Sequence, residues 1–341
     1  METLELIPDF VSVIVPCRNE EKRINGLLQA LLKQTYPLEN LEVIIADGLS
    51  SDKTREVIAQ FRSGNPELQI RVVDNPEQVI PTALNHAIDA ARGEYIVRVD
   101  AHSVPSPTYI AYSIENLKAG KGENVGGLWL IKPGDNSWIA KSIAAAGGHK
   151  LGVGDARYRT SGEPGYVETV PFGSYRNELL SQLGGFDETL LSNEDYDLNH
   201  RIIAQGGKVY FDPKIQIDYI ARSTLADLAR QYWRYGYWKL QMLKKFPKSL
   251  KMRQALPPLF VAWVLIGGLL SVLIPQLRLV YLSSLLVYLI IVILSAIPVA
   301  IKSREPNMIV GVPLAIITMH LSWGSGFLWS LFKNWLIPVK K

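Results

Sequence analysis

Asp100 and His102 lie two residues apart at the end of a short apolar run, 95–99. If the chain bends there, a carboxylate and an imidazole can both reach one divalent cation. Mn²⁺ and Mg²⁺ accept these ligand types, and the imidazole favours manganese. A turn-forming Asp100 and a surface histidine at 102 are the alternatives that the sequence leaves open. The pair therefore predicts a cation site that could hold a phosphate beside a carboxylate.

Polar residues follow two other apolar runs as well. Pro16, Arg18 and Glu20 come after 11–15, and Asp47 comes after 41–46. The sequence has neither the glycine pattern of dinucleotide-binding enzymes nor a P-loop, so phosphate would have to be held by another device, such as a cation. Asp47 could instead shape a turn, and Glu20 could favour the start of a helix.

These residues need a scaffold in which the ends of several strands meet. The first hundred residues alternate short β-branched runs with stretches that have apolar residues at helical spacing. Such alternation predicts an α/β fold with a doubly wound, mostly parallel sheet, in which ligands bind beyond the carboxyl ends of the strands. The predicted strands are 11–15, 41–46, 70–73 and 95–99, and the predicted helices are 23–33, 53–61 and 82–92.

Four motifs in this order carry a resemblance to a known family. They are VSVIVPCRNE at 11–20, ADGLSSDKT at 46–54, VDAH at 99–102 and NEDYD at 193–197. Over about residues 10–240 the chain resembles the inverting family 2 glycosyltransferases with the GT-A fold. Asp-Ala-His in place of Asp-x-Asp, together with GGFD at 184–187, makes it most similar to bacterial exopolysaccharide glycosyltransferases of the succinoglycan type.

The resemblance implies transfer of a sugar from a nucleotide-diphosphate sugar to an acceptor hydroxyl, with inversion at the anomeric carbon. It implies a divalent cation, Mn²⁺ or Mg²⁺, that bridges the diphosphate and is held by Asp100 and His102. The residues that would bind the nucleotide sugar are Pro16, Arg18, Glu20, Asp47 and Asp100.

The same resemblance assigns catalysis to the pair Glu194 and Asp195, with Asp195 as the general base. The acceptor hydroxyl must lose its proton as it attacks from the face opposite the leaving group, and a nearby carboxylate can accept that proton. A solvated helix start is the alternative for this pair. Arg176 is a candidate for binding the acceptor or the diphosphate, or else a surface arginine.

The charge of the chain changes abruptly near residue 227. Residues 1–227 contain 22 Lys and Arg against 31 Asp and Glu, whereas residues 228–341 contain 14 basic residues and one acid, Glu305. The second part also contains three apolar runs, 258–274, 279–301 and 308–332, and about 20 residues of helix can cross a bilayer. We therefore expect an all-α transmembrane region of about three helices, with buried helices of a soluble core as the alternative.

Basic residues flank these runs, with six between 239 and 253 and two more at 302 and 304. Basic loops are typical of the cytoplasmic side, so the first domain is expected there, on an integral protein of the cytoplasmic membrane. Three crossings would leave the basic residues from 333 onward outside, against this tendency. A re-entrant or interfacial third segment therefore stays open.

The remaining composition agrees with an intracellular catalytic domain. Residues 1–10 have three acids and no basic residue, so no signal peptide is expected, and the single cysteine fits a reducing compartment. Basic residues flank apolar runs rather than forming a patch on the first domain, which disfavours nucleic-acid binding.

An aromatic stretch at 231–238 lies at the start of the basic part, before the first apolar run. Gln231, Arg234 and Trp238 belong to a stretch that resembles the Gln-x-x-Arg-Trp motif of membrane glycosyltransferases, although Tyr235 replaces its tryptophan. These residues would contact the acceptor or the diphosphate, or the stretch is an amphipathic helix at the membrane interface. His320, inside the third apolar run, is a second candidate for lipid diphosphate, or a histidine satisfied by a neighbouring group.

The expected division is a GT-A domain at 1–222, an interfacial segment at 223–256, a transmembrane region at 257–333 and a basic tail at 334–341. Residues 125–170 are expected to include a flexible, glycine-rich stretch near the donor. The expected function is transfer of one sugar to a lipid-linked saccharide, a polyprenyl diphosphate, in cell-surface polysaccharide synthesis. Synthesis of a polyprenyl-phosphate sugar and a catalytically silent membrane scaffold are the alternatives, while the sugar, the base and the oligomeric state stay open.

Overall fold

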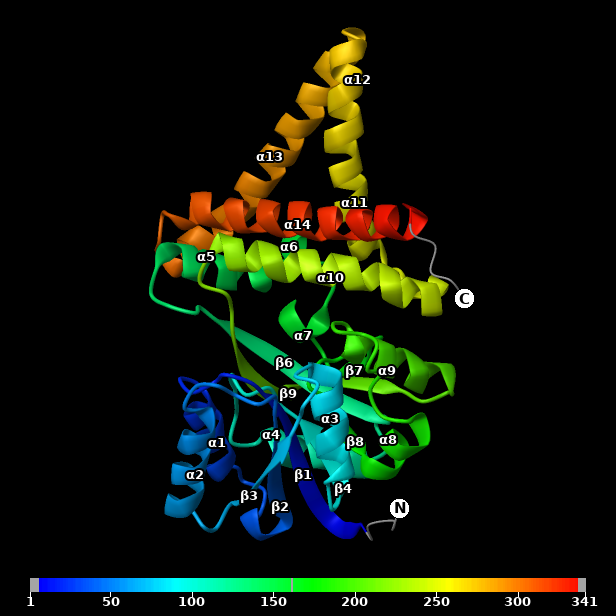
Figure 1. The fold of residues 1–341 in the computed structure, drawn as a ribbon. Helices are drawn as coiled ribbons and strands as arrows, with labels where there is room; N and C mark the ends of the chain where they lie inside the picture. Colours follow the sequence, from blue (N-terminus) through cyan, green and yellow to red (C-terminus); the bar gives the residue numbers. More distant parts are fainter. Residues whose placement is uncertain (1–5, 161, 337–341) are drawn as a thin grey trace. The chain divides into compact units, whose positions relative to one another are not determined.

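The computed structural model describes residues 6–160 and 162–336, which form two compact units (Figure 1). The first unit comprises Met1–Leu130 and Ser161–Tyr219, and the second comprises Ile131–Thr160 and Ile220–Lys341. The expectation that residues 1–10 are no signal peptide and the expectation of a basic tail at 334–341 fall partly on residues 1–5 and 337–341, outside the described residues.

Four parallel strands form one half of the sheet in the first unit, in the order β3-β2-β1-β4. β2 is buried throughout and β1 from Phe10 onward except at the half-buried Pro16, as parallel strands covered on both faces usually are. The predicted alternation of strand and helix is confirmed. The bounds are β1 Ile7–Cys17, α1 Ile24–Leu32, the 3₁₀ turn Leu38–Asn40, β2 Leu41–Asp47, α2 Thr54–Gly64, β3 Gln69–Asp74, α3 Ile80–Asp89 and β4 Gly93–Arg98.

Strands from later in the chain complete the sheet and make it mixed. Beside β4 lie β8, β6, β9 and β5 in that order, with antiparallel pairing of β4 to β8, β6 to β8 and β5 to β9. With β7, which pairs with β9, the described residues form a nine-stranded sheet. The bounds are β5 Ser103–Pro105, α4 Tyr109–Lys118, β6 Asn124–Lys132, β7 Gly165–Tyr166, β8 Ser174–Arg176, α8 Asn177–Leu183, α9 Glu194–Ala204 and β9 Val209–Ile220.

Residues 131–160 belong to the second unit of the structure, whereas the sequence placed them in a domain at 1–222. The flexibility of this stretch near the donor stays a prediction. Residues 131–160 form α5 (Trp138–Gly147), α6 (Lys150–Val153) and α7 (Arg157–Thr160). The small apolar residues of α5 give it a face that needs an apolar partner, and this face joins one buried cluster with residues of α10, α13 and α14.

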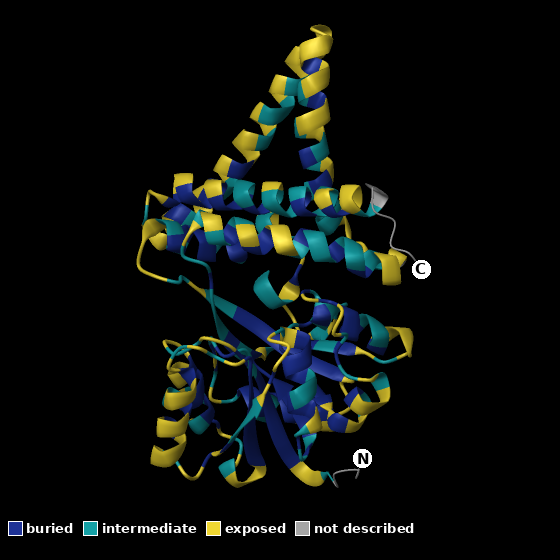
Figure 2. Ribbon diagram, in the orientation of Figure 1, coloured by how far each residue is buried: buried dark blue, intermediate teal, exposed yellow. Residues whose placement is uncertain are grey.

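The rest of the second unit is helical. α10 (Leu225–Lys245) and the 3₁₀ turn Pro247–Ser249 precede three apolar helical stretches, Met252–Leu273, Gln276–Ser303 and Met308–Asn334, each long enough to span a bilayer. The first and second form a hairpin whose outer surface is largely exposed (Figure 2). The hairpin consists of α11 Met252–Ala262, the π-helical turn Trp263–Gly267, α12 Gly268–Leu273 and α13 Gln276–Ser303, and α14 Met308–Leu336 follows.

Gly127 in β6 is a position where the sheet leaves no room for a side chain. A Cβ there would lie 1.8 Å from the backbone oxygen of Ile215 in β9. Gly127→Ala is therefore expected to lower the free energy of unfolding by about 3 kcal/mol, since overpacked strands must shift apart. Thermal unfolding of the purified protein in detergent measures the effect.

Gly26→Ala is the matched control, because a Cβ on Gly26 in α1 would meet nothing within 4 Å. It is expected to raise the free energy of unfolding by about 0.5–1 kcal/mol, as alanine favours a helix over glycine. Equal melting temperatures for the two variants would contradict the packing of β6 against β9.

Candidate active site

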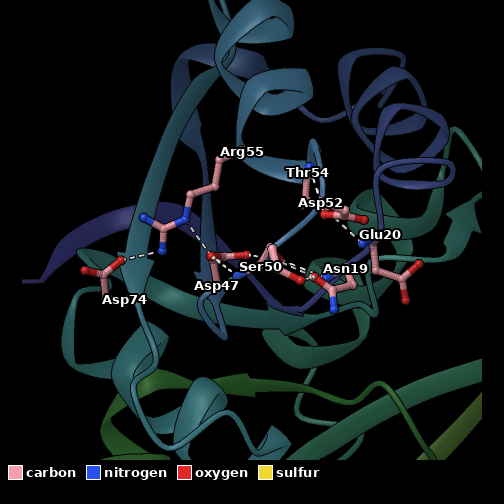
Figure 3. A network of polar contacts seen from close by, with 9 residues as sticks. Asn19, Glu20, Asp47, Ser50, Asp52, Thr54, Arg55 and Asp74 are labelled. Carbon is pink, nitrogen blue, oxygen red and sulfur yellow. Dashed lines mark hydrogen bonds and ion pairs between the residues drawn. The ribbon is translucent and has the colours of Figure 1, made fainter.

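The carboxyl end of β2 forms the first part of the site. Asp47, its last residue, is buried, and its carboxylate accepts hydrogen bonds from the backbone nitrogen of Ser50 at 3.0 Å and the hydroxyl of Ser50 at 2.5 Å. Arg55 Nε pairs with the same carboxylate at 2.6 Å, and Arg55 Nη2 reaches Asp74 at the end of β3 at 2.5 Å (Figure 3). These contacts fix the loop between β2 and α2. The nucleoside contact of Asp47 stays a prediction.

The loop after β1 is tied to the same segment. Asn19 adopts a left-handed conformation with φ 55°, and its backbone nitrogen donates to Ser50 Oγ at 2.8 Å. The backbone nitrogen of Glu20 donates to Thr54 Oγ1 at 2.8 Å (Figure 3). Two of the polar loops that the sequence placed after strands therefore lie together at one edge of the sheet.

Pro16 and Arg18 also belong to this edge. Pro16 pairs in register with Ala46 of β2, and the side chain of Arg18 beyond it is exposed. Arg18 has no hydrogen-bond or ion-pair partner among the residues that the structure describes. Its guanidinium is thus available for an anion.

A buried arginine gathers the acidic residues at the end of β4. Arg98 Nη1 pairs with Asp195 Oδ1 at 2.6 Å, and Arg98 Nη2 pairs with Glu194 Oε1 at 2.9 Å and Asp100 Oδ1 at 3.3 Å. The Arg98 side chain is 3% exposed, so these pairs are shielded from water. The structure thereby brings together the predicted base Asp195 and the predicted cation ligand Asp100.

Two aromatic rings flank this arginine. The Arg98 guanidinium carbon lies 5.7 Å from the ring centres of both Phe172 and Phe186. Phe186 belongs to the GGFD segment, whose backbone is held by Arg201 through hydrogen bonds to the oxygens of Leu183 at 2.8 Å and Gly185 at 2.7 Å. The GGFD segment that the sequence singled out therefore helps to enclose the ion-pair cluster.

Asp195 lies in the first turn of α9, after Asn193 turns the chain with φ 68°. Burial raises the pKa of Asp195 to about 7; the positive charge of Arg98 opposes this shift, and the charges of Glu194 and Asp100 add to it. A carboxylate with a raised pKa is a stronger base than a solvated aspartate, and part of it is still ionised near neutral pH.

His102 points to a different carboxylate. Its Nδ1 lies 3.1 Å from Glu20 Oε1, a contact that orients the imidazole ring. Glu20 was predicted to bind the nucleotide sugar, and the structure gives it this additional partner.

Asp100 and His102 stay predicted ligands of a cation, which would draw its other ligands from a substrate. Within residues 6–160 and 162–336, no group of three or more His, Cys, Asp or Glu side chains is arranged to hold a metal. Mg²⁺ commonly binds through one or two carboxylates plus substrate phosphates and water, so two protein ligands suffice. Arg98 also has one positive charge against three carboxylates, and a divalent cation would offset that excess.

Sequence reasoning missed Arg98, although a signal was present. The residues YIVRV at 95–99 form an apolar strand interrupted by one arginine. Asp100, one possible partner for this arginine, lies only two residues further along the chain. A charge in a buried strand requires charged partners, and two of these come from residues almost a hundred positions later in the chain.

Arg176 does not join this cluster. It pairs in register with Tyr95 near the start of β4, whereas the cluster lies at the other end of that strand. Its guanidinium is bonded to Glu94 and lies 5.1 Å from the ring centre of Tyr95. These contacts explain its position without a substrate, and its acceptor role stays a prediction.

The residues of the 231–238 motif lie in the second unit, on α10. Gln231 is buried and donates a hydrogen bond to Tyr235 Oη at 2.8 Å, while Arg234 is exposed. Trp238 is half-buried and packs edge-on against Tyr237 with ring centres 5.6 Å apart. The motif is thus divided between a packed face and an exposed face of one helix.

His320 is satisfied by protein groups. Its Nδ1 lies 2.9 Å from Tyr288 Oη on α13, and its Nε2 lies 2.8 Å from the backbone oxygen of Leu151 in α6. This agrees with the reading of His320 as a histidine that a neighbouring group satisfies.

Known proteins resemble this chain in sequence and in fold. The sequence model of the family described as Glycosyl transferase family 2 matches residues 12–184. Succinoglycan biosynthesis protein ExoA of Rhizobium meliloti is 29% identical over 334 residues, which cover 96% of each chain. The dolichyl N-acetyl-alpha-D-glucosaminyl phosphate 3-beta-D-2,3-diacetamido-2,3-dideoxy-beta-D-glucuronosyltransferase of Methanococcus voltae is 28% identical over 336 residues, 96% of this chain and 98% of that protein.

A solved structure shares the fold. The mannosyltransferase PcManGT from Pyrobaculum calidifontis, solved in complex with GDP-Man and Mn²⁺, superposes with a TM-score of 0.61. The match covers 98% of this chain and 91% of that chain at 20% sequence identity. The GT-A fold that the sequence motifs implied is confirmed.

Arg98→Met is expected to destabilise the protein by about 3–5 kcal/mol at pH 8, because three carboxylates lose their counter-charge. Without Arg98 the pKa of Asp195, which burial already raises, rises further, so the folded variant takes up a proton as the pH falls. The destabilisation is therefore expected to be smaller at pH 5 than at pH 8. Thermal unfolding of the detergent-solubilised protein at the two pH values measures this difference.

Arg176→Met provides the control, since it removes an arginine from a half-exposed ion pair on the same sheet. Its expected cost is less than about 1 kcal/mol at either pH. An Arg98→Met variant that matched this control, or that lost equal stability at both pH values, would contradict the role of Arg98.

Proposed function

Because this chain belongs to glycosyl transferase family 2, we propose that it is a membrane-anchored, metal-dependent, inverting enzyme that transfers one sugar from a nucleotide-diphosphate sugar to a lipid-linked saccharide. The observation that carries the proposal is the Arg98 cluster, in which the candidate base Asp195 and the candidate cation ligand Asp100 share one buried counter-charge. The product would be an intermediate of cell-surface polysaccharide synthesis.

The donor would bind at the edge formed by the ends of β1, β2 and β4. Arg18, whose guanidinium has no partner within residues 6–160 and 162–336, could bind an anion, and Pro16, Glu20 and Asp47 lie in the loops beside it. Asp100 and His102 would hold Mn²⁺ or Mg²⁺, which when bound neutralises charge developing on the leaving diphosphate. PcManGT, which has the same fold, was solved with GDP-Man and Mn²⁺, and this supports the proposal.

Asp195 would accept the proton of the acceptor hydroxyl. Burial raises the pKa of Asp195 to about 7, so its ionised form is a better proton acceptor than a solvated aspartate. Arg98 orients the Asp195 carboxylate through an ion pair of 2.6 Å. Glu194 pairs with the same guanidinium and so fixes the direction of the Arg98 side chain. Phe172 and Phe186 shield this cluster from water.

The apolar helices of the second unit suggest which class of acceptor the enzyme uses. Three apolar helices long enough to span a membrane would place the enzyme where a polyprenyl-linked saccharide is confined. The M. voltae relative bears the name of an enzyme acting on a dolichyl-linked sugar phosphate, which supports a lipid-linked acceptor. Gln231, Arg234 and Trp238 are then candidates for the acceptor headgroup. The basic residues around these helices favour a catalytic domain on the cytoplasmic side.

The test is a transfer assay with the full chain reconstituted in lipid vesicles, Mn²⁺ and a panel of nucleotide-diphosphate sugars. Two acceptors are compared, a saccharide linked to polyprenyl diphosphate and the same saccharide without the lipid. The rate of transfer to the lipid-linked acceptor is expected to be at least about tenfold higher. Asp195→Asn is expected to lower the rate about 10²–10⁴-fold, since the base is removed.

Glu178→Gln, which changes an exposed carboxylate on α8, is the matched control and should leave the rate unchanged. Equal transfer to soluble and lipid-linked acceptors would overturn the acceptor proposal. Full activity of Asp195→Asn would overturn the assignment of the base. Mass analysis that found glycosylated polyprenyl phosphate instead would favour a polyprenyl-phosphate sugar synthase.

A further inference from the structure

The third apolar helix, α14, packs beside α10 along much of its length (Figure 1). A Cβ on Gly236 of α10 would lie 2.0 Å from the backbone oxygen of Trp323, and a Cβ on Gly326 of α14 would lie 2.1 Å from that of Trp233. The two helices are therefore in direct backbone contact at these glycines.

Side-chain contacts continue the pairing toward the ends of both helices. Gln241 of α10 donates to Ser330 Oγ at 2.9 Å, and Lys244 donates to Asn334 Oδ1 at 2.7 Å. As residue numbers increase along α10, those of its partners on α14 also increase, so the helices run in parallel. Because the two helices are in contact and parallel, α10 must lie at about the same depth in a membrane as α14.

α10 is a poor membrane-spanning helix. Its 21 residues include Arg230, Arg234, Lys239, Lys244 and Lys245, and charged side chains are costly in the hydrocarbon core. Arg230 and Arg234 are exposed on its outer face. A basic amphipathic helix with tryptophan and tyrosine on its surface is instead typical of the headgroup region.

Helices that carry polar side chains and backbone groups, α5 and α6, also cover the first half of α14. A Cβ on Gly311 would lie 2.0 Å from Ser142 Oγ of α5, and His320 bonds to the backbone oxygen of Leu151 in α6 at 2.8 Å. Just before α14, Lys141 of α5 pairs with Glu305 at 2.5 Å. A spanning α14 would draw these elements into the bilayer as well.

The hairpin is less covered by protein than α14, although α11 and α13 also contact α14. Its tip half is covered by little protein and exposes large apolar side chains (Figure 2). The second stretch has the higher mean hydropathy, 2.7 against 1.5 for α14, and a smaller buried share, 17% against 44%. Among the exposed side chains are Leu265, Leu269, Val272, Leu273, Leu279, Val280, Leu282 and Leu286.

We infer that α14 lies along the membrane surface beside α10, so that only the hairpin of α11, α12 and α13 enters the hydrocarbon core. The partner of this surface is a bilayer with anionic headgroups, which the basic residues of α10 attract. The exposed apolar face of α14, with Val310, Leu314, Leu321, Trp329 and Phe332, contacts the acyl-chain boundary.

This arrangement places both ends of α14 on the same side of the membrane as α10. The basic residues at 302 and 304 and Lys333 are then on the same side of the membrane as the basic residues of α10. The conflict between three crossings and the distribution of basic residues disappears.

The test is a labelling experiment on single-cysteine variants of the full chain. Cys17, the one cysteine in the sequence, is buried and is replaced by alanine. Cysteines then replace Lys251 before the hairpin, Asn307 before α14 and Lys333 near its end, all exposed positions. A membrane-impermeant maleimide is added to right-side-out or inside-out vesicles.

Labelling of all three cysteines from one face is expected. Modification of Lys333→Cys only from the face opposite to Asn307→Cys would overturn the inference, because α14 would then span. No sugar transfer is measured, so the result is independent of the proposed function.

A measurement of depth in the bilayer is a second test, for the case that one of the three maleimide-labelling variants is poorly produced. Spin labels at Val310, Leu321 and Phe332, all on exposed positions of α14, should report similar, shallow depths. A label at Leu321 far deeper than those at Val310 and Phe332 would show a spanning helix and contradict the inference. A spin label at Leu282, on the exposed face of the hairpin, is the deep control.

Discussion

The buried guanidinium of Arg98 determines how the catalytic end of the sheet is organised. One guanidinium in β4 is paired with Asp100 on the turn that follows the same strand and with Glu194 and Asp195 at the start of α9. These groups are far apart in the sequence and would repel one another without it. Breaking a buried ion pair by removing one partner is strongly unfavourable, so the cluster also fixes where α9 begins relative to the sheet.

The same cluster sets the electrostatics of the pocket. Three carboxylates against one arginine leave an acidic site, and an anionic diphosphate would be repelled unless a divalent cation accompanied it. The second unit is organised by a different interaction, the burial of apolar surface. α5, α10 and α14 cover one another through small residues and an apolar cluster that part of α13 also joins, whereas most of the hairpin keeps its apolar surface exposed.

The parallel half of the fold and the polar strand ends could be predicted from the sequence, because periods of two and 3.6 residues are local properties. The antiparallel half could not, since β8 has three residues and no periodicity of its own. Asp100 and Asp195 were named from motifs, but Arg98 was not, because two of its three partners, Glu194 and Asp195, become neighbours only in three dimensions. The helices at 138–160 were missed since the apolar face of α5 has meaning only beside α14.

The need of the acidic cluster for a cation can be measured directly by calorimetric titration of UDP and GDP into the purified full chain. With Mn²⁺ present, one of the two nucleotides should bind, and excess EDTA should weaken that binding at least tenfold. Asp100→Asn should remove most of the difference between the two conditions. Equally tight binding in EDTA and in Mn²⁺ would show that the pocket accepts a diphosphate without a divalent cation and would contradict the central role given to the Arg98 cluster.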